Sequence, residues 1–437
     1  MYQSAICSNA DGTFLFSGLI SYFGHNSVIP TYRGGAVFAY QGGNPPPKKS
    51  ERSNELCQNP VRTATPSTSP ASPLMLAYHE KMRQESRWER TEVNHLTVAP
   101  LDKNSPLFGD RTSFAPAVSE DAIRDTADNL GLAIKLGDHY YPLRDTAYKS
   151  LLDRAKINGT ALPKLSREKL SEVLNSCLAL HNKSGALLLI RDEKVAAAHS
   201  GDSRDYSILE IDQLLEGLRD KMDARFPDNR FLGGYSDHAI TSASWSLPMQ
   251  KEDLLGAYEK MLESMGKKAT ASRLTPGIRF STSDTGMASA KVAALLVGLE
   301  HPIHIGSIVA VEHRRQSKIP DFIESLDQLF AQYGDSIARL TNLLTVQLEH
   351  PVNAMTAICK KLSLPKKAAL ESIAMFEAAI GNGSATAHDV FMSMQEIPFI
   401  MKTSGVPESK LLTVQETMAR ALTLRWSDYD YAKQVSY

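Results

Sequence analysis

The chain has 437 residues, of which 42% are hydrophobic and 22% are charged, and its formal net charge is -1. This composition is typical of a globular protein, and it excludes a global positive field that would attract nucleic acid or an anionic membrane. No apolar run approaches the ~18 residues that a membrane-crossing helix requires. The four cysteines form no CxxC pair, which disfavours structural zinc and disulfide bonds. We therefore expect a cytoplasmic protein without membrane contact.

Residues 1–73 differ in composition from the rest of the chain. They contain two Gly-Gly pairs, a run of three prolines at 45–47 and a Thr/Ser/Pro tract at 63–73. No hydrophobic period of 2 or 3.6 residues persists there, so the segment cannot bury enough apolar surface to offset the loss of chain entropy. It is predicted to be a disordered leader.

The next part of the chain is mainly helical in pattern. A helix is expected over 74–90 and an edge strand over 93–98, followed by a linker interrupted by prolines at 100–116. Ser119 and Ser166 are expected to cap two helices, and a third helix follows Pro142.

After Gly185 the hydrophobic period changes to that of strands. The predicted strands are 186–191, 195–199, 239–247, 278–283, 287–299 and 303–311. Helices over 208–222 and 251–265 separate the earlier strand units, and the last three strands form an antiparallel meander within 273–318. These patterns predict an α+β fold with a central, mainly antiparallel sheet flanked by helices on one face.

Beyond Lys318 only helical patterns remain. A long amphipathic helix is expected from Pro320 to just before Pro351, followed by further helices up to Trp426. The predicted organisation is a leader at 1–73, an α+β sheet domain at 74–318 and a separate helical C-terminal region at 319–437.

Three stretches carry a resemblance to a known family. They read YYPLRDTA at 140–147, VAAAHSGDSRDYSI at 195–208 and IRFSTSDTGMASA at 278–290. Together they resemble the phage- and plasmid-encoded family of unknown function numbered nine-three-two. In that family a strand ending in Ser-Asp-Arg-Tyr leads into a helix, and a later strand with a Ser-(Asn/Ser)-(Glu/Asp)-x-Gly signature begins the second half of the sheet.

This chain departs from the first family motif by an insertion between the serine and Tyr206, so either Asp202 or Asp205 takes the position of the family's aspartate. The resemblance covers about 136–315. It implies a mobile-element setting, in a phage, plasmid or integrated conjugative element, and no established activity.

Four aspartates are candidate catalytic residues: Asp202, Asp205, Asp237 and Asp284. They lie in loops or at strand ends, where converging carboxylates could hold Mg²⁺ for chemistry on nucleic acids or nucleotides. Turn and cap aspartates are the more common explanation. Apart from this Mg²⁺, no cofactor is expected. His301, His304 and His313 have poor spacing for a metal site, because neighbouring strand positions point to opposite faces.

A basic surplus supports a binding hypothesis instead. Within 273–318 there are six basic and three acidic residues, a surplus of three positive charges in a chain that is almost neutral. The candidate nucleic-acid-binding residues are Arg279, Lys291, Arg314, Arg315, Lys318 and Trp245. Basic residues of this kind track a phosphate backbone, and Trp245, Tyr206, Tyr235 or Phe280 would stack on unpaired bases. A solvated strand face is the alternative explanation.

The leading functional hypothesis is therefore a mobile-element protein that binds single-stranded DNA in recombination, replication or transfer. One alternative is a metal-dependent enzyme acting on nucleic acid or nucleotides through the four aspartates. Another is a regulator or anti-host factor that binds protein partners through the C-terminal helices.

Overall fold

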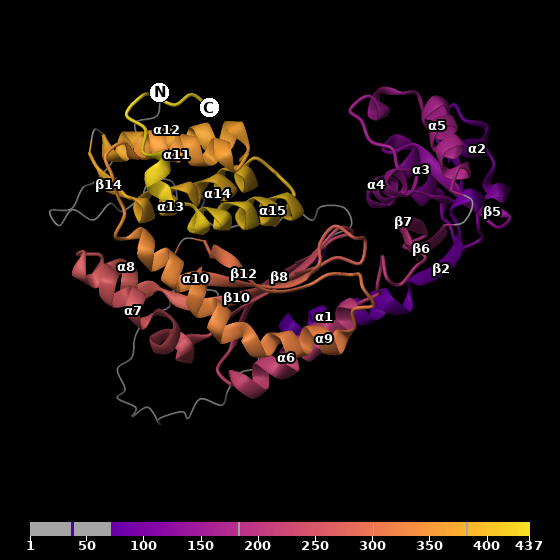
Figure 1. Cartoon of the computed structure of the whole chain (residues 1–437). Helices are drawn as coiled ribbons and strands as arrows, with labels where there is room; N and C mark the ends of the chain where they lie inside the picture. Colours follow the sequence, from indigo (N-terminus) through magenta and orange to yellow (C-terminus); the bar gives the residue numbers. More distant parts are fainter. Residues whose placement is uncertain (1–35, 39–70, 182–183, 300, 382) are drawn as a thin grey trace, which may run out of the picture.

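The predicted meander forms one side of the larger sheet and ends at its edge. The computed structural model of the protein describes residues 36–38, 71–181, 184–299, 301–381 and 383–437 (Figure 1). Strands β10 (Thr275–Thr282), β11 (Ala290–Val297) and β12 (Ile303–Val311) pair antiparallel as consecutive neighbours. The three-strand meander is confirmed. The predicted leader lies outside the described residues, except for 36–38 and 71–73.

Three further strands extend this sheet on one side. Its order is β1-β8-β9-β10-β11-β12, with β1 at Ala36–Phe38, β8 at Arg230–Ser236 and β9 at Thr241–Ser246. The alternating pattern predicted β9, whereas β8 was missed. Its sequence RFLGGYS contains two adjacent glycines, which are poor strand formers, and its pairing with β9 is irregular between Phe231 and Gly233.

Helices cover both faces of the larger sheet, so the expectation of helices on one face is wrong. Phe280 of β10 packs edge-on against Phe322 of α9 (Ile319–Ser325), with ring centroids 5.7 Å apart. The neighbouring Arg279 points to the opposite face and bonds to Gln415 of α15 (Glu408–Ala419). Strand β11, which lies between β10 and β12, is apolar and mostly buried at consecutive positions, which is typical of a strand covered on both sides.

A second group of elements comprises β2 to β7 and α2 to α5 (Figure 1, upper right). It packs around buried clusters that are separate from the core of the larger sheet. One small sheet has the order β2-β6-β7, with bounds Arg87–Glu92, Gly185–Arg191 and Lys194–Ser200. Another has the order β3-β4-β5, with bounds Thr97–Pro100, Leu132–Leu136 and His139–Pro142. The helices are α2 (Pro106–Gly109), α3 (Glu120–Asp128), α4 (Asp145–Arg154) and α5 (Arg167–Ala179).

Most of the local sequence signals in this group predict the observed elements. Ser119 and Ser166 accept hydrogen bonds from the backbone N–H groups of α3 and α5, which confirms both caps. The predicted hairpin is β6–β7, and Asp192 and Glu193 have φ values of 46° and 64°, as a tight two-residue turn requires. The helix expected over 74–90 is shorter. It ends at Gln84 as α1 (Ala71–Gln84), and β2 follows.

The remaining helices pack on the larger sheet or on one another. They are α6 (Ile211–Arg225), α7 (Lys251–Ser264), α8 (Lys268–Arg273), α10 (Leu329–Leu343), α11 (Pro351–Lys361), α12 (Lys366–Ile380), α13 (Ala387–Met394) and α14 (Glu396–Thr403). The long helix expected after Pro320 is two helices, because a 3-10 turn at Leu326–Gln328 separates α9 from α10. A two-residue pair, β13 (Gln347–Leu348) and β14 (Ala385–Thr386), ties the chain between these helices.

The sheet and the C-terminal helices share one hydrophobic core. Phe280 of the sheet, Leu340 of α10, Phe391 of α13 and Trp426 near the C-terminus belong to the same buried cluster. The fold is mixed α+β, with antiparallel sheets followed by a mostly helical C-terminal region, as predicted. The proposed boundary at residue 318 stays a prediction. Within the described residues, no helix is both long and apolar enough to cross a bilayer.

Candidate functional site

The turn that follows β10 is where the family-like stretches meet. Asp284 lies in this turn, and its backbone carbonyl accepts two hydrogen bonds from the stretch at 195–208. The Tyr206 hydroxyl donates at 2.8 Å, and His199 Nε2 lies at 2.9 Å. Because a carbonyl can only accept, His199 carries its proton on Nε2. Two stretches that are far apart in the sequence are thus joined at one atom.

Three aromatic rings are stacked beside this turn. The rings of His199 and Tyr206 are parallel within 4° with centroids 3.6 Å apart, and His313 stacks on the other side of Tyr206 at 5.7 Å. His313 Nε2 contacts the Thr282 hydroxyl at 3.2 Å. A Cβ added at Gly286 would lie 2.9 Å from His199, and the φ of Gly286 is 78°. Both facts explain why a glycine follows Ser283-Asp284-Thr285 in the sequence.

A buried ion pair completes the arrangement. Arg191, at the end of β6, pairs with the Asp284 carboxylate, and their side chains are only 13% and 14% exposed. Burial lowers the pKa of Arg191, but the charge of Asp284 and the hydrogen bond outweigh it and raise the pKa overall. We call Asp284, Arg191, His199, Tyr206 and His313 the Asp284 joint.

The stretch at 140–147 contacts the β6–β7 turn, which also carries Arg191 at its start. Arg144 donates to the Asp192 carboxylate at 2.9 Å, and its backbone N–H donates to the carbonyl of Val195 at 3.0 Å. All three family-like stretches therefore converge around the turn that carries Asp284. They connect the smaller group of elements to the larger sheet.

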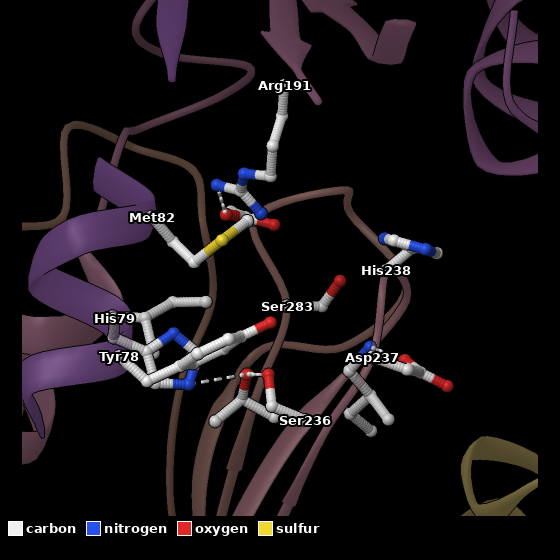
Figure 2. A pocket seen from close by; sticks show the side chains of 12 residues that line it. Tyr78, His79, Met82, Arg191, Ser236, Asp237, His238 and Ser283 are labelled. Carbon is white, nitrogen blue, oxygen red and sulfur yellow. Dashed lines mark hydrogen bonds and ion pairs between the residues drawn. The ribbon is translucent and has the colours of Figure 1, made fainter. Parts of the chain in front are cut away.

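A small polar pocket lies at this junction. Figure 2 shows Tyr78 and His79 entering it from α1, Arg191 and Ser283 opposite them, and Asp237 from the β8–β9 turn. The pocket volume is about 10 Å³, which is room for about one water molecule. The pocket is too small for a substrate. Its lining includes groups that bond to each other, such as Arg191 with Asp284 and His79 with Thr241.

The four candidate aspartates each have partners of their own. Asp202 pairs with Arg204 at 2.6 Å, which lowers the pKa of Asp202 to about 2. Asp205 accepts from the Ser200 hydroxyl at 3.0 Å. Asp237 accepts from the Tyr235 hydroxyl and from two backbone N–H groups of its own turn, and Asp284 pairs with Arg191.

These partners explain each aspartate as a turn or pairing residue. Asp237 and Asp284 line the small pocket, whereas Asp202 and Asp205 lie in the loop after β7. In the part of the chain that the structure describes, no three His, Cys, Asp or Glu side chains are grouped so as to hold a metal ion. The magnesium hypothesis gains no support from this geometry.

Burial holds two histidines of this region in the neutral form. Burial lowers the pKa of His79 to about 4, although the charge of Asp284 opposes the shift. Burial also lowers the pKa of His199 to about 4, against the hydrogen bond to the Asp284 carbonyl. Both side chains lie less than a tenth exposed. Each is therefore neutral in the folded protein at pH 7.

Acid is therefore expected to destabilise the protein. In the unfolded chain the two histidines have a pKa of ~6.5, whereas in the folded protein their pKa is about 4. Their contribution to the free energy of unfolding is therefore complete above about pH 6.5 and is lost as the pH falls towards 4. Between pH 7 and pH 5 each histidine should lower the free energy of unfolding by about 2 kcal/mol.

Urea denaturation at several pH values measures this effect. His79→Gln should remove about half of the pH dependence that the two histidines produce, whereas His95→Gln, at an exposed position, should leave it unchanged. Equal pH dependence in the wild type and His79→Gln would show that His79 does not stay neutral.

The candidate nucleic-acid-binding residues do not share one exposed face. Trp245 is buried in the core at 3% exposure, with its ring against Phe231. Arg279 and Lys291 lie beneath α15, where they bond to Gln415 and Glu416. Arg314, Arg315 and Lys318 are exposed in the loop after β12. Of the other aromatic residues expected to stack on bases, Phe280 and Tyr206 are buried, and the Tyr235 hydroxyl donates to the Asp237 carboxylate at 2.7 Å.

A shallow groove lies next to the exposed basic loop. It has a volume of about 240 Å³, and its lining includes Arg90, Gly201, Ser203, Tyr206, Gln316 and Ser317. Two loops form most of it, the one after β7 and the one after β12. Hydrogen bonds join them, from the backbone N–H of Arg315 to the carbonyl of Arg204 at 2.8 Å and from that of Gln316 to the carbonyl of Ser203 at 3.2 Å. The sequence motifs indicated one of these loops but not their contact.

Comparison with known proteins found no matching family model, no similar curated protein and no similar solved structure. The resemblance to the mobile-element family therefore remains an expectation that rests on the three quoted stretches.

Proposed function

We propose that the protein binds the phosphate backbone of single-stranded DNA along the groove between the loops after β7 and β12, in the cytoplasm, during recombination, replication or transfer of a mobile element. The setting rests on the family-like stretches alone. The binding site rests on one structural observation, the strained and basic loop that borders the groove.

The loop after β12 holds two consecutive residues in a left-handed conformation. The φ values of Arg315 and Gln316 are 59° and 61°, and neither residue is glycine. Such conformations cost on the order of 1 kcal/mol or more each, and they cluster at ligand-binding loops. Here the backbone bonds to Arg204 and Ser203 hold the strained pair in place. The loop therefore presents its side chains in one fixed arrangement.

The charges beside the groove suit a phosphate chain. Arg204, Arg315 and Lys318 directly neighbour the lining residues Ser203, Gln316 and Ser317 in the sequence, and all three basic residues are exposed. Arg90 lines the groove itself and donates to the carbonyl of Gly201 at 2.8 Å. Arg204 and Arg314 also contact the carboxylates of Asp202 and Glu312, so a phosphate would compete with these exposed, weak ion pairs.

The groove favours one flexible strand over a duplex. Its volume is just below the range of about 300–1,000 Å³ that is typical of small-molecule sites, so it holds a short sugar–phosphate segment. A duplex needs a broad basic surface, whereas the exposed basic residues beside this groove lie on two short loops. Because Trp245, Phe280 and Tyr206 are buried, binding is expected to be independent of base sequence.

Removing the basic loop should weaken binding in a salt-dependent way. In a triple variant with Arg314, Arg315 and Lys318 replaced by alanine, we expect weaker binding to a fluorescent single-stranded oligonucleotide. The slope of log K against log salt should change by about 2, since each lost phosphate contact contributes about 0.7. Fluorescence anisotropy between 50 and 200 mM salt measures both quantities.

The matched control removes three exposed lysines from the C-terminal helices, Lys361, Lys367 and Lys410. It loses the same charge and should bind as the wild type does. Both variants should keep the wild-type melting temperature, because exposed basic residues contribute little to stability. Absence of salt-sensitive binding in the wild type, or equal losses in the two variants, would rule out the groove. A parallel titration with duplex DNA tests the preference for a single strand.

A further inference from the structure

A second basic site lies on the other side of the sheet from α9, beneath α15. Arg279 projects from the middle of β10 towards this helix. Its Nε donates to the Ser244 hydroxyl on β9 at 3.3 Å, and its Nη1 donates to the side-chain oxygen of Gln415 at 2.5 Å. Both partners are neutral. They orient the guanidinium without balancing its charge.

Lys291, on the neighbouring strand, has a carboxylate partner. Lys291 on β11 forms an ion pair with Glu416 at 2.9 Å, one residue along α15 from Gln415. Among the described residues, Arg279 has no such carboxylate within ion-pair distance, and Glu408 is the acidic residue whose charge acts on it from further away. A guanidinium has five donors, and only two of its hydrogen bonds are accounted for here. Leaving a half-buried charge without a counter-ion destabilises a fold by several kcal/mol.

His304 supplies an independent sign of a missing partner. It lies on the same face of the sheet, because Gly277 pairs with Leu295 and Leu295 pairs with His304, and Arg279 is two residues from Gly277. Its side chain is 4% exposed, and Nδ1 has no hydrogen-bond partner within the described part of the chain. Burial and the positive charges of Arg279 and Lys291 lower the pKa of His304 to about 3. The ring is therefore neutral, and its Nδ1 remains available to a ligand.

We propose that Arg279, together with His304 and Ser244, binds a small oxyanion between the sheet and α15, and that a phosphate group is the ligand that fits best. A phosphate offers several oxygens to the planar set of donors of an arginine. It also supplies a negative charge beside Arg279, where no carboxylate forms an ion pair among the described residues. An imidazole with its proton on Nδ1 donates one further hydrogen bond.

This site is separate from the DNA-binding groove. Thr282, which contacts His313 near the groove, is three residues from Arg279 on β10, so its side chain points to the opposite face.

Titration with inorganic phosphate at constant ionic strength tests the proposal. The melting temperature of the wild type should rise as phosphate replaces chloride, and calorimetry should show binding. In Arg279→Gln the dissociation constant should rise about tenfold or more, because charge-assisted hydrogen bonds are lost. Arg315→Gln, which removes a charge at the groove, should respond to phosphate as the wild type does. No response in the wild type, or an equal response in Arg279→Gln, would overturn the site.

A second variant tests the charge argument without removing the arginine. Gln415→Glu places a carboxylate where the amide oxygen now accepts from Arg279, so it should form the missing ion pair. We expect a higher melting temperature in chloride together with loss of the phosphate response. Thr413→Glu adds the same charge at an exposed position of α15 and should show neither effect. Full phosphate binding by Gln415→Glu would contradict the proposal, whatever the outcome for Arg279→Gln.

The same measurements separate this inference from the proposed function. Arg279→Gln should bind single-stranded DNA with wild-type affinity, and the triple variant of the groove should bind inorganic phosphate normally. Loss of DNA binding in Arg279→Gln would show that the phosphate recognised beneath α15 belongs to a nucleic acid and would contradict a separate site for a small anion.

Discussion

Arg191→Met is expected to lower the free energy of unfolding by about 4 kcal/mol, since removing one partner of a buried ion pair leaves the other charge without compensation. The Asp284 carboxylate would remain largely buried, because the Tyr206 and His199 side chains still form hydrogen bonds to the backbone carbonyl of Asp284. Methionine has a similar length and keeps the apolar contacts of the arginine stem. Urea denaturation measured by circular dichroism at pH 7 gives the free energy directly.

A double variant distinguishes the loss of the pair from general disruption. When Asp284 is also replaced, as in Arg191→Met with Asp284→Asn, no buried charge remains, and much of the stability should return. Arg204→Met is the control, because Arg204 forms an ion pair with Asp202 at an exposed position. It should leave the free energy of unfolding close to that of the wild type. If Arg191→Met unfolds no more easily than Arg204→Met, the ion pair does not hold the two groups of elements together.

Leu340→Asp should have an even larger effect, a loss of about 5 kcal/mol. Leu340 lies on α10 with its side chain fully buried in the cluster that joins the sheet to the C-terminal helices. The substitution removes a buried leucine, which alone costs about 2–5 kcal/mol, and it introduces a carboxyl group that must be protonated to stay buried. The melting temperature and the protection of the sheet from proteolysis should both decrease.

The matched control is Ala338→Asp, two residues away on the exposed side of the same helix. It introduces the same side chain and a similar loss of helix propensity, about 0.5 kcal/mol, without burying it. Near-wild-type stability of Leu340→Asp would mean that the apolar stripe of α10 is accessible. The helix would then be a candidate surface for protein partners, as in the regulator hypothesis.

The candidate site was only partly accessible from the sequence. The stretches at 195–208 and 278–290 drew attention to Asp202, Asp205 and Asp284 because carboxylates in loops suggest metal binding. Arg191 was not singled out, although it ends a predicted strand directly before a turn. Its partner Asp284 is 93 residues away, and no local pattern connects the two. The pairing turns a candidate metal ligand into one half of an internal ion pair.

The basic residues show the same limit. The sequence between Arg273 and Lys318 has a surplus of positive charge. In the folded protein, strand alternation and packing place these basic residues on different surfaces. Arg279 and Lys291 point to the face that α15 covers, whereas Arg315 and Lys318 lie in a loop bordering a groove. Whether a helix covers a sheet face depends on its own apolar side and on the chain that precedes it, so charge counts could not assign these residues to one surface.

The local elements follow from the sequence alone. Alternating side chains indicate β9, β10 and β12, short apolar runs indicate β11 and the hairpin β6–β7, and Ser119 and Ser166 indicate two helix starts, because these signals act within a few residues of backbone. Three features depend on tertiary contacts: helices cover both faces of the sheet, Asp284 contacts Arg191, His199 and Tyr206, and Arg279 lies beside a carboxamide. These contacts join distant positions, and burial and side-chain packing select them after the local elements have formed.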